Sequence, residues 1–132
     1  MDAIDLHVHS TFSDGTLTPS ELVSRAKQFH LAAMALTDHD TIEGIPEAVQ
    51  AASEQNLELV PGVELSTFWD EKEIHIVGLF IDYTDKTFQK ELESLRDVRR
   101  NRNITMCEKF TQLGIPIDYS AVSYTHLRAH ET

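Results

Sequence analysis

The sequence predicts an α/β fold in which parallel strands alternate with helices, followed by a β-hairpin and a long helix. Segments with strand-like and helix-like patterns alternate from the N-terminus to about residue 60. One strand-like segment, Ala32 to Leu36, is apolar throughout, as expected of a strand buried on both faces. Such alternation implies a parallel sheet or barrel with right-handed crossovers.

Two segments are expected to form strands whose carboxyl ends carry candidate functional residues. Ala3 to His9 alternates in a way that puts His7 and His9 on one face. Ala32 to Leu36 runs into a polar cluster that contains His39. Active sites of parallel α/β folds lie beyond the carboxyl ends of the strands, so these histidines are expected to meet there.

The first helix is expected to open at Thr18, which suits the N-cap position. Pro19 suits the first helical position, and Glu21 completes a capping box. Its buried stripe is expected to comprise Leu22, Val23, Ala26 and Phe29. A second helix is expected from Ile45 to Glu54.

The next segments predict a third strand and a hairpin. Leu57 to Val60 leads a strand towards Glu64, and the β-rich runs Leu65 to Trp69 and Ile74 to Ile81 flank a short polar loop. His75 lies near the start of its run rather than at the end. A strand that overshoots the barrel rim and turns back would bring His75 down to Glu64.

Six candidate metal ligands fall within this part of the chain. They are His7, His9, Asp14, His39, Glu64 and His75. Neutral imidazoles combined with hard carboxylates suit Mn²⁺, Fe²⁺ or Zn²⁺. Taken singly, Asp14 before Gly15 could be a plain turn and Glu64 an ordinary salt-bridge partner; the whole set favours metal. Asp38 and Asp40 are expected to orient neighbours or cap the turn instead.

The motifs around these residues resemble those of the polymerase and histidinol phosphatase (PHP) superfamily of metal-dependent phosphoesterases. They are Leu17-Thr18-Pro19, Thr37-Asp38-His39-Asp40-Thr41, Pro61-Gly62-Val63-Glu64 and Glu73-Ile74-His75-Ile76-Val77-Gly78-Leu79. Within the superfamily they are most similar to the branch of nucleotide 3′,5′-bisphosphate phosphatases and 5′→3′ exoribonucleases. The resemblance implies the N-terminal part of a distorted (β/α) barrel of PHP type. It also implies up to three divalent ions in the complete domain, with Mn²⁺ expected.

The resemblance further implies a role for each ligand. His7 and His9 would hold one metal, Glu64 would bridge it to a second held by His75, and Asp14 and His39 would hold a third. His7, His9 and Glu64 would be catalytic through a metal-bound hydroxide that attacks phosphorus. The implied substrate is a small phosphorylated nucleotide or a short RNA. The alternatives are a histidinol-phosphate-type phosphatase and a non-catalytic metal-binding or interaction module.

A basic cluster lies on the long amphipathic helix that is expected from Thr87 to Leu113. Its members are Arg96, Arg99, Arg100 and Arg102. The simpler interpretation is a solvated face on which the arginines pair with Glu91 and Glu93. The sharper hypothesis is that Arg99 and Arg100 bind a second phosphate of the substrate, whose geometry suits a guanidinium fork.

Composition and net charge indicate which classes of partner and which location to expect. The net charge of −11 argues against a broad electrostatic hold on nucleic acid, so stable duplex binding is not expected. The longest apolar runs fall short of the ~20 residues of a membrane span, and the N-terminus lacks the pattern of a signal peptide. The single Cys107 excludes an internal disulfide, and a cytoplasmic location is expected.

The chain is also expected to be a fragment. Residues 1–119 match the N-terminal part of a PHP domain, whereas a complete barrel takes ~250 residues. Residues 120–132 do not continue the pattern of the superfamily and are expected to be a non-native tail. Each metal would then have an incomplete protein shell, so the fragment is expected to be inactive alone.

Overall fold

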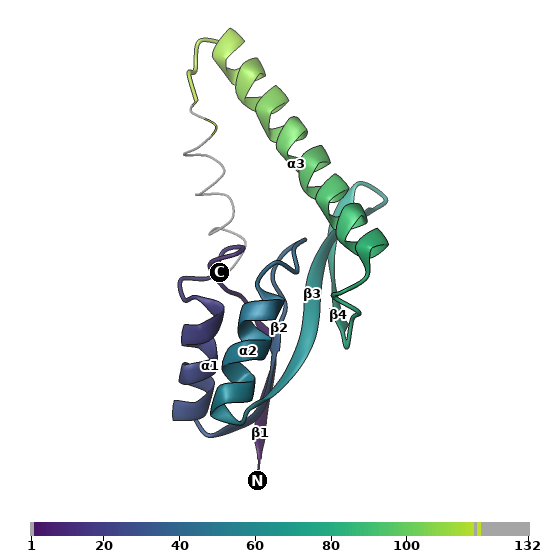
Figure 1. Cartoon of the computed structure of the whole chain (residues 1–132). Coiled ribbons are helices and arrows are strands. Elements are labelled where there is room, and N and C mark those ends of the chain that lie inside the picture. Colours follow the sequence, from purple (N-terminus) through teal and green to yellow (C-terminus); the bar gives the residue numbers. More distant parts are fainter. Residues whose placement is uncertain (1, 118, 120–132) are drawn as a thin grey trace.

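The computed structural model describes residues 2–117 and residue 119, and it confirms the predicted α/β fold (Figure 1). Its elements in chain order are β1 (Ala3–Val8), α1 (Pro19–Gln28), β2 (Leu31–Leu36), α2 (Ile45–Gln55), β3 (Glu58–Trp69), β4 (Lys72–Leu79) and α3 (Lys86–Gln112). Helices α1 and α2 lie side by side against the strands, and α3 extends away from the hairpin. The predicted tail at residues 120–132 lies outside the described residues.

The sheet has the strand order β1-β2-β3-β4. Strands β1, β2 and β3 are parallel, and β4 returns antiparallel to β3. The carboxyl ends of β1 and β2 therefore lie at one edge of the sheet, beside the middle of β3. This edge carries the candidate ligands.

Strand β3 is one continuous strand of 12 residues, whereas the sequence pattern predicts two separate runs, Leu57 to Val60 and Leu65 to Trp69. Its first part pairs with β2, and the part from Gly62 onward pairs with β4. Gly62 allows the close approach of both neighbours, because a Cβ there would lie 2.8 Å from Thr37 Cγ2 and 2.9 Å from the Gly78 carbonyl oxygen. The uninterrupted strand carries Glu64 from the sheet to the hairpin.

Helix α1 begins as predicted. The Thr18 side chain accepts a hydrogen bond from the Glu21 amide at 3.2 Å, and the Glu21 carboxylate accepts one from the Thr18 amide at 2.8 Å. The prediction that Phe29 is buried was wrong, since its side chain is 66% exposed. Phe29 is the C-cap of the helix, and the chain turns away at His30 with φ of 58°.

The core consists of two apolar clusters, and each contains residues of β2 and of α2. The first contains Val23, Ala26, Met34, Ala51, Ala52 and Leu57; the second contains Leu36, Ile42, Ile45, Ala48, Val63 and Leu92. Leu92 belongs to α3 and is 1% exposed. Its burial fixes the N-terminal part of α3 against the sheet and thereby fixes where the arginines of that helix lie.

Helix α3 is the longest element, with 27 residues. It is rich in charged residues, and its predicted start and end are confirmed within one residue. Among the residues that the structure describes, no helix is both long and apolar enough to span a membrane.

Candidate metal centre

The end of β1 supplies two imidazoles. The His7 and His9 rings have their centroids 5.0 Å apart, and both point towards the same carboxylate, that of Glu64. His7 Nε2 contacts Glu64 Oε1, and His9 Nε2 lies 3.6 Å from that oxygen. The two-residue spacing therefore places both rings on one face, as the sequence predicts.

The loop after β1 brings Asp14 back to these imidazoles. Asp14 Oδ1 lies 3.5 Å from His9 Nδ1, and Asp14 Oδ2 lies 3.2 Å from His39 Nε2. The Gly15 amide donates to the Ser10 carbonyl at 2.9 Å and closes the turn. A Cβ at Gly15 would lie 2.2 Å from the His9 carbonyl oxygen, so glycine permits this tight return. Asp14 is thus part of the cluster and its side chain is buried.

Asp38 holds that loop in place. Its carboxylate accepts hydrogen bonds from the Ser10 amide and the Ser10 hydroxyl, both at 2.6 Å, and from the Ser13 hydroxyl at 2.7 Å. Asp38 follows β2, so these bonds join the loop after β1 to the end of the neighbouring strand. The expectation that Asp38 orients its neighbours is confirmed.

The end of β2 places His39 against the middle of β3. The Asp40 amide donates to the Glu64 carbonyl at 3.0 Å, and the Glu64 amide donates to the Asp38 carbonyl at 3.0 Å. These bonds continue the parallel ladder past the end of β2. The His39 ring stacks on the His9 ring with centroids 4.5 Å apart, and Asp40 has φ of 53°, which turns the chain away from the sheet.

Glu64 lies at the centre of the imidazoles. Its Oε2 lies 2.9 Å from His39 Nδ1 and 2.8 Å from His75 Nδ1. Burial raises the pKa of Glu64, but the hydrogen bond with His75 and the charge of His39 outweigh it, so the pKa is lowered on balance. Glu64 is therefore an ionised carboxylate at neutral pH.

The hairpin places His75 beside Glu64, as the sequence predicts. His75 on β4 pairs with Ser66 on β3, one step along the same face from Glu64. The overshoot and return of β3 and β4 thus bring His75 to Glu64, although His75 lies near the start of its strand. Its hydrogen bond with Glu64 raises the pKa of His75, while burial followed by the charge of His39 lowers that of His9.

The six residues form three overlapping groups whose candidate ligand atoms lie within 4.8 Å of one another. The groups are His7, His9 and Glu64; His9, Asp14 and His39; and His39, Glu64 and His75. Each group combines imidazole nitrogens with a carboxylate oxygen, a donor set that fits first-row divalent metals. The geometry brings together all six residues that the sequence singled out.

The arginines of α3 make contacts that the sequence analysis did not foresee. The expected pairing of the basic cluster with Glu91 and Glu93 was wrong for Arg96 and Arg99. Arg96 donates to the Asp40 carbonyl at 2.8 Å, and Arg99 lies 3.2 Å from Asp40 Oδ2. A signal was present, because Arg96 and Arg99 lie one and two turns after buried Leu92 and so share its inward face.

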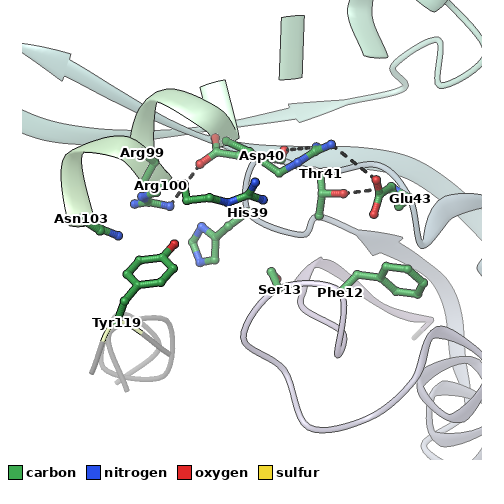
Figure 2. A pocket seen from close by; sticks show the side chains of 11 residues that line it. Phe12, Ser13, His39, Asp40, Thr41, Glu43, Arg99, Arg100, Asn103 and Tyr119 are labelled. Atoms are coloured by element: carbon green, nitrogen blue, oxygen red, sulfur yellow. Dashed lines mark hydrogen bonds and ion pairs between the residues drawn. The ribbon is translucent and has the colours of Figure 1, made fainter. Parts of the chain in front are cut away.

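A cavity of about 210 Å³ opens beside the cluster (Figure 2). Its lining includes His39 and Asp40 from the sheet edge, and Arg99, Arg100 and Asn103 from α3. Figure 2 shows the α3 side chains on one side of the hollow and Ser13 and Phe12 on the other. The cavity therefore places guanidinium groups next to a candidate metal ligand.

Comparison with known proteins identifies relatives of the chain. A sequence profile described as the PHP domain matches residues 5–124. The 5′-3′ exoribonuclease of Haemophilus influenzae is 48% identical over 115 residues, which are 87% of this chain and 42% of that protein. The 3′,5′-nucleoside bisphosphate phosphatase of Chromobacterium violaceum is 42% identical over 115 residues, with coverage of 87% and 40%.

A solved structure shares the fold as well. An amidohydrolase from Chromobacterium violaceum with bound sulfate superposes with a TM-score of 0.78 at 40% identity and covers 89% of this chain and 41% of its own. The chain therefore spans about two fifths of the length of these relatives.

Proposed function

Because the chain belongs to the PHP domain family, we propose that it supplies the N-terminal part of the active site of a metal-dependent phosphoesterase. The observation that carries this proposal is the convergence of six imidazole and carboxylate ligands into three groups. The similar proteins from Haemophilus influenzae and Chromobacterium violaceum are named as a nuclease and a nucleotide phosphatase. Phosphate esters of nucleotides are therefore the proposed substrates, either a 3′,5′-bisphosphate nucleotide or a short RNA.

The donor set suits two or three divalent ions. Buried Asp14 and Glu64 bring negative charge that cations would neutralise, and the lowered pKa of His9 favours the neutral imidazole that binds metal. Mn²⁺ is the proposed ion, and the same donors also accept Fe²⁺ or Zn²⁺. Such ions would supply Lewis acidity, which polarises a phosphoryl oxygen and stabilises the charge that develops on it.

The residues of the chain would arrange the substrate around this centre. Arg96, Arg99 and Arg100 of α3 line the cavity beside His39, where a phosphate could be held while its ester bond lies at the cluster. Arg100 is the better candidate for a second phosphate, since its side chain is 60% exposed and its contact with Asp97 is long, at 3.7 Å. Arg99 lines the same cavity but already lies close to two carboxylates.

A chimaera tests the proposal. Residues 5–117 of this chain would replace the matching segment of the bisphosphate phosphatase from Chromobacterium violaceum, which is 42% identical there. With Mn²⁺, the chimaera is expected to release phosphate from adenosine 3′,5′-bisphosphate or nucleotides from a short 5′-phosphorylated RNA. Glu64→Gln should abolish this release, and Glu58→Gln, at the exposed far end of the same strand, should not.

Two results would contradict the proposal. A well-folded chimaera that hydrolyses histidinol phosphate but neither nucleotide substrate would assign the site to a different phosphatase. A chimaera that stays fully active with Glu64→Gln would show that the cluster does not carry the reaction.

A further inference from the structure

Glu73 connects His75 to helix α3. Glu73 Oε1 lies 3.2 Å from His75 Nε2 and 3.1 Å from an amino nitrogen of Arg99. His75 meanwhile turns its other nitrogen, Nδ1, to Glu64 at 2.8 Å. The imidazole is therefore held from both sides, by a carboxylate of the cluster and by one that lies outside it.

Arg99 extends the connection to a second part of the site. Its other amino nitrogen lies 3.2 Å from Asp40 Oδ2, while Asp40 Oδ1 accepts a hydrogen bond from the Ser66 amide at 2.9 Å. One guanidinium thus joins the turn that follows His39 to the hairpin that carries His75. Burial of Leu92 in the core fixes the helix that presents this guanidinium.

We propose that Glu73 and Arg99 are positioning residues, which hold the His75 imidazole with Nδ1 directed into the metal cluster. The inference rests on the proposed function, because a positioning role for Glu73 and Arg99 requires that His75 binds a metal ion. A carboxylate on the outer nitrogen of a ligating histidine fixes the ring and raises its basicity, and loss of such a partner typically weakens metal binding 10–100-fold. Arg99 acts one step further out, by holding the Glu73 carboxylate in place.

An ordinary surface ion pair would have different neighbours. Solvent-exposed ion pairs contribute little to stability, because solvent screens their charges and ordering two long side chains costs entropy. Here the Glu73 and Arg99 side chains are 28% and 23% exposed, and each also touches a residue of the site, His75 or Asp40. The pair therefore links two ligand-bearing segments instead of two points on the surface.

Calorimetric titration of the 132-residue chain with Mn²⁺ alone gives the first test. Glu73→Ala is expected to weaken Mn²⁺ binding 10–100-fold, and Glu73→Gln, which keeps an acceptor but loses the charge, should fall between it and the wild type. The controls are Glu71→Ala, an exposed glutamate in the turn just before β4, and Arg102→Gln, which removes the arginine stacked on Phe68. Neither control is expected to change the affinity more than about twofold.

A double variant tests whether Arg99 acts through Glu73. Arg99→Gln alone should weaken Mn²⁺ binding, and Glu73→Ala with Arg99→Gln should bind about as weakly as Glu73→Ala alone. A double variant whose loss equals the product of the two single losses would overturn the claim that Arg99 works through Glu73.

A metal-free measurement separates this inference from the proposed function. Three-bond couplings to His75 Cγ report the χ1 rotamer in the labelled chain without metal. The wild type and Glu71→Ala should show one rotamer, and Glu73→Ala should show averaging.

The outcomes of the two measurements are distinct. If the folded wild type binds no Mn²⁺, the proposed function fails, and the couplings alone decide whether Glu73 positions His75. Unchanged couplings in Glu73→Ala, or Mn²⁺ affinity no weaker than in Glu71→Ala, would overturn the positioning role.

Discussion

Replacement of Asp38 by alanine should destabilise the chain strongly without removing a proposed metal ligand. The Asp38 side chain is 2% exposed and accepts three short hydrogen bonds, two from Ser10 and one from Ser13. Alanine would leave the Ser10 amide and hydroxyl buried without their acceptor, because Ser10 is fully buried. Ser13 is only half-buried, so its hydroxyl can turn to water.

The magnitude follows from the two donors of Ser10. A hydrogen bond to a charged group contributes ~1.5–3 kcal/mol, so loss of both is expected to lower the free energy of unfolding by about 3–6 kcal/mol. This is a large part of the ~5–15 kcal/mol that stabilises a typical domain. Asp38→Asn keeps the shape and one acceptor oxygen, and should cost about half as much.

Urea unfolding of the metal-free chain, followed by circular dichroism, measures these losses. Asp97→Ala is the matched control, since its side chain is 58% exposed on α3, and it should change the free energy of unfolding by less than about 0.5 kcal/mol. A loss below about 1 kcal/mol in Asp38→Ala would refute the argument that Asp38 holds the loop after β1 to the end of β2.

Three further perturbations have defined outcomes. Gly15→Ala should weaken Mn²⁺ binding at least 10-fold in calorimetry, because the new Cβ would lie 2.2 Å from the His9 carbonyl oxygen and displace the turn that carries Asp14. A Mn²⁺ affinity equal to that of the wild type would show that this turn does not position the ligands. In the chimaera, Arg100→Gln should raise KM for adenosine 3′,5′-bisphosphate ~10–100-fold but change KM for a nucleoside monophosphate little. Arg102→Gln is the control, and equal effects of Arg100→Gln on both substrates would exclude a role for Arg100 in binding the second phosphate. Mn²⁺ affinity should rise as pH increases above 6.5, because the pKa of His75 is raised, mainly by its hydrogen bond to Glu64, and a proton on His75 competes with the metal. Without metal, the stability from that hydrogen bond is present below pH 6.5 and is lost as pH rises through the raised pKa. A pH-independent Mn²⁺ affinity would contradict the assignment of His75 as a ligand.

Much of the fold followed from local patterns in the sequence. The capping box at Thr18 located the start of α1, and the apolar run before His39 located β2. The PHP-type fold that the motifs implied is confirmed by the matching domain profile and by the structural neighbour. These features were accessible because they depend on contacts between residues that are close in the sequence, or on motifs whose spacing is itself informative.

The meeting of the candidate ligands was also accessible, because strand ends at one edge of a parallel sheet lie together. The expected hairpin turn then explained why His75, near the start of its strand, lies beside Glu64. The role of each residue as a ligand remains a prediction that metal binding must test.

The features that the sequence analysis missed depend on tertiary contacts. Phe29 fits the spacing of the buried stripe, but the helix ends at that residue and the chain turns away. Arg96 and Arg99 looked like members of a solvated face, and the long-range contact with Asp40 decided otherwise. Helical spacing indicates that Arg96 and Arg99 share the face of Leu92, but it does not show that this face packs against Asp40. The exposure of Phe29 likewise depends on where the helix ends.

The number of metal ions bound per folded chain shows whether the six converging residues bind metal. Elemental mass spectrometry after purification with Mn²⁺ would be applied to the wild type, Glu64→Gln, Asp14→Asn and the control Glu58→Gln. Glu64 belongs to two of the three ligand groups and Asp14 to one, so Glu64→Gln should lose more metal than Asp14→Asn, and Glu58→Gln should lose none. A well-folded wild type without bound metal, or equal metal content in all four proteins, would show that these residues do not form a metal site.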